Sequence, residues 1–123
     1  MRDSFLGKRI RGGGYALKGA WLLLKNEASI QVQFVISIIM TIVGIYFEIT
    51  GTEWILQLLA IGLVMSAEGL NSAIEAMADF IHPDFHSKIG HIKDIAAGGV
   101  CFAAIIAFII GCIIYYPYFF PGI

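Results

Sequence analysis

Charged side chains are scarce in this sequence, and their charges nearly cancel. Asp, Glu, Lys and Arg make up 14% of the 123 residues, whereas a soluble domain carries about 25%. Hydrophobic residues reach 59%. The net charge of −1 provides no general attraction for nucleic acid or for an acidic partner. These values exclude an ordinary soluble domain and favour a single membrane-embedded domain over residues 1–123.

Cysteine is also scarce, and the familiar nucleotide-binding motifs are lacking. Cys101 and Cys112 lie eleven residues apart in one apolar run, about 16 Å along a helix, which is too far for a disulfide. No GxxxxGKS/T loop, GxGxxG turn or GxSxG elbow occurs. The three histidines share one loop without the cysteine partners typical of zinc sites. Any nucleotide must therefore be bound without a P-loop or Rossmann scaffold.

Three long apolar runs are present. They cover Ile30–Phe47, Trp54–Ala78 and Ile95–Tyr116. Each approaches or exceeds the ~20 residues that a helix needs to cross a ~30 Å hydrocarbon core. An isolated span must be helical, because lipid offers no hydrogen-bonding partner to the backbone. The sequence predicts transmembrane helices over residues 30–49, 54–81 and 95–116.

The two links between these spans differ in length and charge. Gly51, between two threonines, favours a tight turn in the first link, whereas Pro83 ends a helix and begins a polar loop over residues 82–94. Six of the eight basic residues fall in the first 25 positions, and the other two, Lys88 and Lys93, fall in the loop. Since basic residues flank spans on the cytoplasmic side, we expect the N-terminus and this loop to be cytoplasmic. Aromatic residues typical of the membrane interface are Tyr46, Trp54, Tyr115, Tyr116 and Tyr118.

The segment before the first span has a different pattern. Over residues 5–26, leucines and Trp21 alternate with Lys18 and Lys25. This mixture is typical of an amphipathic helix lying on the membrane surface. A basic anchor without any ligand role fits the segment equally well.

The last span carries small residues at every fourth position. They are Gly99, Ala103, Ala107 and Gly111. Such a ridge favours close helix packing, within one chain or between chains. Three spans alone can hardly enclose a polar site, so we expect a homo-oligomer.

Polar side chains recur along one face of the second predicted span. They are Glu68, Asn71, Ser72, Glu75 and Asp79. At 100° per residue all five lie within about 100° of arc and rise by roughly 16 Å. Ionisable groups at membrane depth are costly and usually mark function. A structural seam between helices is the alternative, and it suits Ser72 alone better than the whole set.

Carboxylates crowded on one helix face repel each other unless a cation lies among them. Mg²⁺ takes one or two protein carboxylates and completes its shell with water and phosphate oxygens. Glu27 closes the basic segment at the depth where Glu75 should emerge from the membrane. We therefore expect Mg²⁺ at these acidic residues, although a solvated helix-end charge is the alternative for Glu27.

These residues resemble a known family. The second span contains EGLNSAIE at residues 68–75, Asp79 follows, and KDIAAG occupies residues 93–98. This spacing strongly resembles the prokaryotic diacylglycerol kinase and undecaprenol kinase family, with a likeness that covers about residues 8–116. The resemblance implies a homotrimer in the bacterial plasma membrane, each chain having a surface helix and three spans. It also implies transfer of the ATP γ-phosphate to the hydroxyl of a membrane lipid.

The resemblance implies a role for each site residue. Glu68 would be the general base that accepts the lipid hydroxyl proton, Asn71 would orient the catalytic groups, and Asp79 would support them. Glu27 and Glu75 would hold Mg²⁺ at the nucleotide phosphates, which agrees with the reliance of phosphoryl transfer on positioning and charge neutralisation. The implied nucleotide contacts are Tyr15, Glu27, Glu75, Asp84, Phe85, His86, Lys93 and Asp94.

The acceptor lipid is the least determined part of this interpretation. Lys8 replaces an arginine that some relatives carry near the chain start, and with Glu68 it is the implied acceptor contact. The runs IKDIAAGGV at 92–100 and IIGCIIYYP at 109–117 look more like undecaprenol kinases, so undecaprenol is favoured and diacylglycerol comes next. The alternative function is a small proton- or cation-coupled transporter or channel subunit. That function requires a polar path across the whole bilayer, whereas residues 54–67 offer only Gln57 and Ser66.

Overall fold

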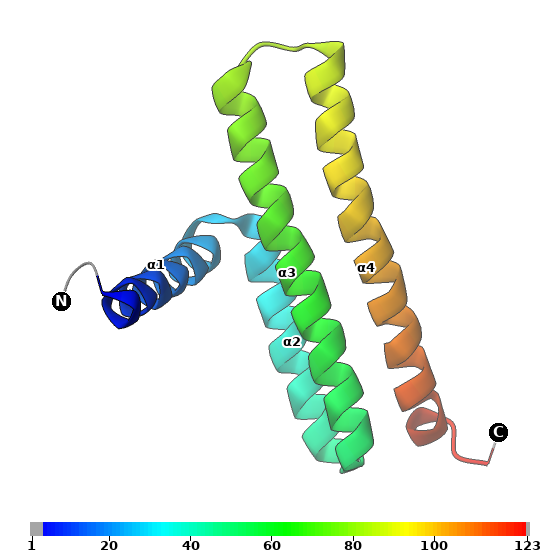
Figure 1. Cartoon of the computed structure of the whole chain (residues 1–123). Helices are drawn as coiled ribbons and strands as arrows, with labels where there is room; N and C mark the ends of the chain where they lie inside the picture. Colours follow the sequence, from blue (N-terminus) through cyan, green and yellow to red (C-terminus); the bar gives the residue numbers. More distant parts are fainter. Residues whose placement is uncertain (1–3, 123) are drawn as a thin grey trace.

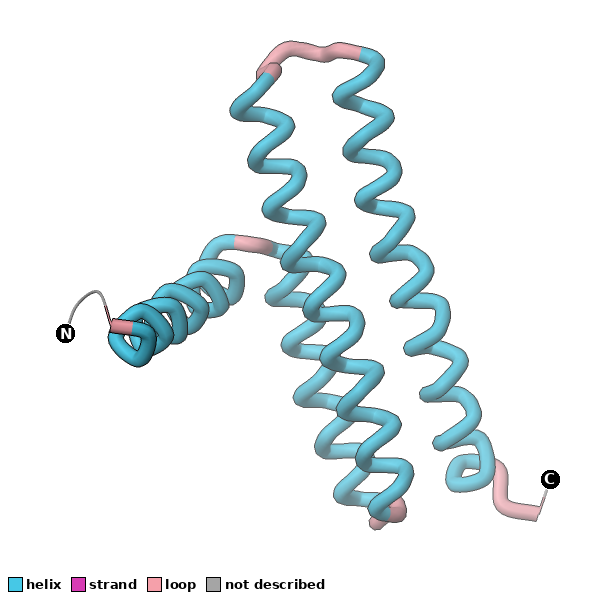
Figure 2. The backbone as a smooth tube through the Cα atoms, in the orientation of Figure 1, coloured by secondary structure: helices cyan, strands magenta, loops and turns pink. Residues whose placement is uncertain are grey.

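Four helices make up the chain in the computed structural model, which describes residues 4–122 (Figure 1). They are α1 (Phe5–Asn26), α2 (Ala28–Phe47), α3 (Gly51–Ile81) and α4 (Ser87–Phe119). No strand occurs within these residues, and short loops connect the helices (Figure 2). Arg2, one of the six basic residues near the N-terminus, lies outside this range. The expected all-α fold is confirmed.

Helices α2, α3 and α4 are each long and apolar enough to cross a membrane. Many of their apolar side chains point outward, including Phe102, which is 76% exposed, and Ile113, which is 69% exposed. Such a surface is stable in hydrocarbon and unfavourable in water. The fold is therefore that of a small integral membrane protein.

Helix α1 projects away from the three long helices and joins them near the middle of α3 (Figure 1). The side-chain amide of Gln31 donates to the carbonyls of Leu24 (3.1 Å) and Lys25 (3.0 Å), which ties the end of α1 to α2. A Cβ added at Gly69 on α3 would lie 3.1 Å from Cδ1 of Leu23. The absence of a side chain at Gly69 thus lets Leu23 pack closely against α3, and the end of α1 is held by both neighbours.

A short turn joins α2 to α3. Glu48 ends α2 in the left-handed conformation (φ 52°), and its N–H donates to carbonyls of the last turn of α2. Thr50 and Glu53 then form a capping box, in which each side chain accepts a backbone N–H of the other. Gly51, the residue that indicated the turn in the sequence, is instead the first residue of α3. The left-handed position falls on Glu48.

Buried side chains gather near this turn, where all three long helices meet. Gly44 is in contact with Trp54, because an added Cβ would lie only 2.8 Å from the indole. The turn-end cluster, as we call this group, comprises Met40, Val43, Phe47, Ile49, Trp54, Ile110, Ile114, Tyr115 and Tyr118.

The loop between α3 and α4 is shorter than expected. Helix α4 begins at Ser87, and Nδ1 of His86 caps it by accepting the N–H of Lys88 (3.1 Å). The expected loop over residues 82–94 was therefore too long, because a side-chain cap at His86 starts the helix early. As a result, Lys93 and Asp94 lie on α4.

Candidate functional site

The polar face of α3 begins where α1 meets the long helices. Gly69, next to Glu68 in the chain, is the residue that Leu23 of α1 contacts. Glu75 lies about two turns beyond Glu68, and α3 itself continues past its junction with α1 (Figure 1) to Ile81. The polar face therefore extends from the level of the surface helix toward the α3–α4 loop.

Asn71 and Glu75 are directly connected within this face. Nδ2 of Asn71 donates to Oε1 of Glu75 at 3.0 Å, across one helical turn. Oδ1 of Asn71 is buried and accepts no hydrogen bond from residues 4–122. Buried polar atoms are nearly always paired, and exceptions are frequent at sites that receive a ligand. The amide thus orients the carboxylate and leaves one acceptor available.

Lys93 joins this face from α4. Its Nζ lies 2.5 Å from Oδ1 of Asp79, with side-chain exposures of 36% and 60%. Asp79 follows Glu75 by one turn, so the ion pair brings a cation next to the carboxylates. The structure therefore joins Asn71 to Glu75 and Lys93 of α4 to Asp79, whereas Glu68 lies on the same face of α3 about 16 Å from Asp79.

Glu27 lies between α1 and α2. Its backbone N–H donates to the carbonyl of Leu23 (3.0 Å), and its half-buried side chain does not cap α2. Because Leu23 contacts α3 at Gly69, the junction places Glu27 near the start of the polar face. The carboxylate belongs to the one segment that connects the surface helix with the spans.

The other candidate residues are exposed and farther apart. Asp84, Phe85 and His86 form the α3–α4 loop; the carbonyl of Asp84 pairs with His82 at 2.7 Å, and the ring of Phe85 is 90% exposed. Asp94 is exposed on α4. Lys8 and Tyr15 lie on α1, and Tyr15 is 71% exposed. Helix α1, which carries both residues, projects away from the three long helices (Figure 1).

The oxygen ligands of this site suit a hard cation. Within residues 4–122, no group of three or more His, Cys, Asp or Glu side chains is arranged to hold a metal ion. Mg²⁺ does not require one, because it takes one or two carboxylates and keeps water and phosphate as its other ligands. The unpaired oxygen of Asn71 beside Glu75 fits a hydrated cation or another hydrogen-bond donor.

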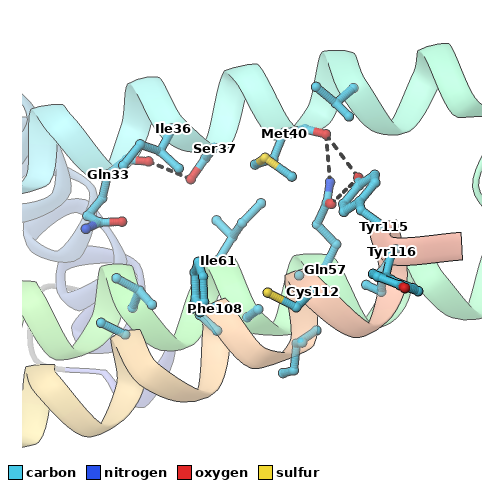
Figure 3. A pocket seen from close by; sticks show the side chains of 18 of the residues that line it. Gln33, Ile36, Ser37, Met40, Gln57, Ile61, Phe108, Cys112, Tyr115 and Tyr116 are labelled. Atoms are coloured by element: carbon cyan, nitrogen blue, oxygen red, sulfur yellow. Dashed lines mark hydrogen bonds between the residues drawn. The ribbon is translucent and has the colours of Figure 1, made fainter. Parts of the chain in front are cut away.

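An apolar groove of about 600 Å³ opens between α2, α3 and α4 (Figure 3). Among the residues that line it are Gln33 on α2, Ile61 and Val64 on α3, and Ala107 and Gly111 on α4. On α3 the groove ends at Val64, one turn before Glu68. The groove and the polar face are thus consecutive stretches of one helix surface.

Sequence reasoning missed a polar pair inside this groove. Gln57, only 5% exposed, accepts a hydrogen bond at 2.5 Å from the hydroxyl of Tyr115, which is itself 5% exposed. Tyr115 had been interpreted as an interfacial aromatic residue. The available signal was Gln57 itself, a lone amide in an apolar run, which needs a buried partner.

Comparisons with known proteins agree with this arrangement. The family model described as prokaryotic diacylglycerol kinase matches residues 14–115. The chain is 33% identical to diacylglycerol kinase of Escherichia coli K12 over 113 residues, covering 89% of this chain and 90% of that protein. It is 36% identical to undecaprenol kinase of Bacillus subtilis over 103 residues, covering 84% of each. The region matched by the family model, residues 14–115, spans the polar face of α3 and Lys93.

Proposed function

The chain belongs to the prokaryotic diacylglycerol kinase family and is a membrane lipid kinase, and we propose that it transfers the γ-phosphate of ATP to the hydroxyl of a membrane lipid alcohol. The observation that carries this proposal is the shared helix face. There Glu68, at the level of the surface helix, is followed by the Asn71–Glu75 pair and by the Lys93–Asp79 pair. A lipid hydroxyl and a nucleotide can reach this face from opposite sides of the membrane boundary.

Glu68 is the general base in this proposal. It is the first acidic residue beyond the apolar groove, so a lipid in the groove presents its hydroxyl there. The carboxylate accepts the hydroxyl proton while the oxygen attacks the γ-phosphorus, and ADP leaves with the electrons of the broken P–O bond. Lys8 on α1 is the second proposed contact of the acceptor, although the single chain keeps it away from Glu68.

The phosphates of the nucleotide are handled by three other residues, Asn71, Glu75 and Glu27. The hydrogen bond from Asn71 fixes one oxygen of Glu75, which leaves the other directed to ligands. Glu75 and Glu27 would hold Mg²⁺, whose chemistry when bound is to neutralise charge on the transferring phosphates. Oxygen donors and the unpaired Oδ1 of Asn71 support this assignment.

The nucleotide occupies the end of the site near the α3–α4 loop. Lys93 contacts phosphate, with Asp79 holding it in place beforehand. The remaining proposed contacts are Tyr15, Asp84, Phe85, His86 and Asp94. The exposure of the loop residues supports a role in binding a soluble ligand.

We further propose a homotrimer in the bacterial plasma membrane, with the N-terminus and the α3–α4 loop in the cytoplasm. The basic residues of α1, Lys88 and Lys93 all support this orientation. Lys8 and Tyr15 belong to α1, and this helix projects away from the three long helices (Figure 1), which supports an assembly of several chains. In a trimer, Lys8 and Tyr15 of one chain can reach the α3 face of a neighbouring chain.

Undecaprenol is the favoured acceptor, with diacylglycerol next. Support comes from the runs at residues 92–100 and 109–117, which look more like undecaprenol kinases. Relatives bearing either name match most of the chain at similar identity, 36% and 33%. The distinction must come from direct comparison of the two lipids.

The test is phosphorylation by radiolabelled ATP and Mg²⁺ in parallel micelles that contain undecaprenol or diacylglycerol. We expect labelled lipid from both, with the higher kcat/KM for undecaprenol. Absence of labelled product from either lipid, with protein shown to be folded, would contradict the kinase assignment. Cation flux through reconstituted vesicles without phosphorylation would instead support the transporter alternative.

A further inference from the structure

A single residue, Glu27, separates α1 from α2. Its backbone is extended (φ −101°, ψ 115°) between two helices that each end directly beside it. Its N–H donates to the carbonyl of Leu23 (3.0 Å), and its carbonyl accepts the N–H of Gln31 (3.0 Å). Because this corner contains no loop, the angle between the two helices and the direction of the Cα–Cβ bond of Glu27 are set together by the same two backbone angles.

The side chain of Gln31 closes this corner. Its Nε2 group donates to the carbonyls of Leu24 (3.1 Å) and Lys25 (3.0 Å), in the last turn of α1. In a continuous helix, backbone N–H groups four residues farther along the chain would pair with these carbonyls. The last carbonyls of a helix lack such partners. The amide of Gln31 therefore supplies two hydrogen bonds that the end of α1 would otherwise miss.

The position of Gln31 in α2 explains how it reaches α1. It follows Glu27 by four residues, which is about one helical turn. Side chains on a helix point back toward the N-terminus of that helix. The amide of Gln31 therefore extends over the first turn of α2 to the end of α1.

The carboxylate of Glu27 is not used to hold this corner. An acidic residue at the start of a helix commonly accepts an N–H of the first turn, but the side chain of Glu27 does not cap α2. The amide of Gln31 holds the end of α1 from the side of α2, and the contact of Leu23 with Gly69 holds it from the side of α3. This division leaves the half-buried carboxylate for a ligand.

Resting on the proposed role of Glu27 in holding Mg²⁺, we propose that Gln31 is a positioning residue for the Glu27 carboxylate. The two hydrogen bonds of its amide fix the angle between the surface helix and the first span. They thereby fix the direction in which the side chain of Glu27 enters the site. Gln31 acts through Glu27, and not through contact with the metal ion or with a substrate.

A purely structural role of Gln31 predicts a different result. Each of two neutral hydrogen bonds is worth about fivefold in an equilibrium constant. If these bonds only stabilise the fold, their loss lowers the melting temperature and leaves the metal affinity of the folded protein unchanged. If they position Glu27, their loss lowers the metal affinity of the folded protein.

The test measures metal binding without turnover. Mn²⁺ replaces Mg²⁺ as a paramagnetic probe, and its binding to the full-length protein with a non-hydrolysable ATP analogue is followed by electron paramagnetic resonance in detergent. Gln31→Met nearly keeps the length of the side chain and removes the donor. We expect Mn²⁺ binding to weaken by about fivefold or more, whereas binding of the analogue without metal stays at the wild-type value. Wild-type Mn²⁺ affinity in folded Gln31→Met protein would overturn the inference.

A double-mutant cycle shows whether Gln31 acts through Glu27. Glu27→Gln removes the carboxylate charge and should itself weaken Mn²⁺ binding. In this background, Gln31→Met should change the remaining affinity by less than about twofold, because no carboxylate is left to position. An equal loss in both backgrounds would mean that Gln31 affects the metal by another route, which contradicts the proposal.

Two further variants complete the comparison. Ser29→Met places the same side chain at an exposed position in the first turn of α2, where it leaves the bonds of Gln31 in place. It should keep the wild-type Mn²⁺ affinity, and a loss as large as that of Gln31→Met would count against the proposal. Gln31→Asn decides the question if Gln31→Met does not fold. Its amide is one methylene too short to keep both bonds, so Mn²⁺ binding should weaken by about fivefold.

The measurements separate the failure of this inference from that of the proposed function. If wild-type protein binds no Mn²⁺ with the analogue and phosphorylates neither lipid, the proposed kinase function fails, and this inference with it. If wild-type protein binds Mn²⁺ and Glu27→Gln weakens that binding, the proposed metal role of Glu27 stands. Wild-type affinity in the Gln31 variants then shows that this inference alone is wrong.

Discussion

Lys93 on α4 and Asp79 on α3 form an ion pair across the two helices, with Nζ 2.5 Å from Oδ1. The pair is too exposed to contribute much to stability, since such pairs are worth about 0–1 kcal/mol. The ion pair instead positions the Lys93 ammonium group, which it holds one helical turn from Glu75. A phosphate that arrives at this site can take the place of the Asp79 carboxylate as partner of Lys93.

Replacement of Lys93 should therefore damage nucleotide use far more than folding. We expect Lys93→Gln to lower kcat/KM for ATP by about 100-fold or more, because charge-assisted phosphate contacts are lost, while the melting temperature changes little. Asp79→Asn should have a smaller effect, mainly on KM. Lys88→Gln, a charge-matched change at an exposed position of α4, is the control. Equal losses in the Lys88 and Lys93 variants would argue against a phosphate contact.

The Asn71–Glu75 hydrogen bond predicts a specific effect of Asn71→Asp. The variant replaces the donor amide with a carboxylate beside Oε1 of Glu75, so the two groups repel each other. Turnover should fall by about 100-fold in single-turnover assays, with the protein still folded. Ser72→Ala, at the next position of the same face, should stay close to wild type. Full activity of Asn71→Asp would exclude an orienting role for the amide.

Glu75 and Glu68 should separate into metal and base functions. Glu75→Gln removes charge at nearly constant shape, so turnover should be almost abolished and the Mg²⁺ concentration dependence altered. Glu68→Gln should abolish turnover while ATP binding, measured by calorimetry, remains. Parallel loss of ATP affinity in Glu68→Gln would place that residue in the nucleotide site instead.

The sequence predicted the helices well because their signals are local. Apolar runs of membrane-spanning length and the spacing from Glu68 to Asp79 need no tertiary information, and both appear in the structure as predicted. The errors occurred where side chains bond across the chain. His86 caps α4 and shortens the loop, and Tyr115 pairs with Gln57, 58 residues away, which no periodicity reveals.

The shape of the site was less predictable than its residues. From the sequence, Glu27 and Glu75 are expected to share a metal ion only because both should lie at the same depth in the membrane. In the structure, the contact of Leu23 on α1 with Gly69 on α3 holds the end of α1 against α3. The groove could not be predicted, because side chains of three separate helices line it and their packing depends on tertiary structure. A helix can be predicted from its own segment of the sequence, whereas the packing between helices depends on several segments together.

The turn between α2 and α3 offers a way to stabilise the protein without touching the site. Glu48 is held at φ 52°, which costs a non-glycine residue about 1 kcal/mol or more. We expect Glu48→Gly to raise stability by roughly 0.5–1 kcal/mol in detergent unfolding, with unchanged kinase activity. The same change at Glu53 should destabilise, because Glu53 completes the capping box. A lower melting temperature for Glu48→Gly would mean that its side chain contributes more than the backbone relief.

Gly44 should be the least replaceable glycine of the spans. A methyl group there would lie 2.8 Å from the indole of Trp54 and 3.1 Å from Ile49, both in the turn-end cluster. Gly44→Ala should therefore cost about 1–3 kcal/mol through overpacking, even though alanine favours a helix. Gly62→Ala, which meets open space on α3, should be neutral or stabilising by up to about 1 kcal/mol. Thermal unfolding of the two variants in the same detergent checks the contrast, and equal stability would mean that α2 and α3 do not pack this closely in the membrane.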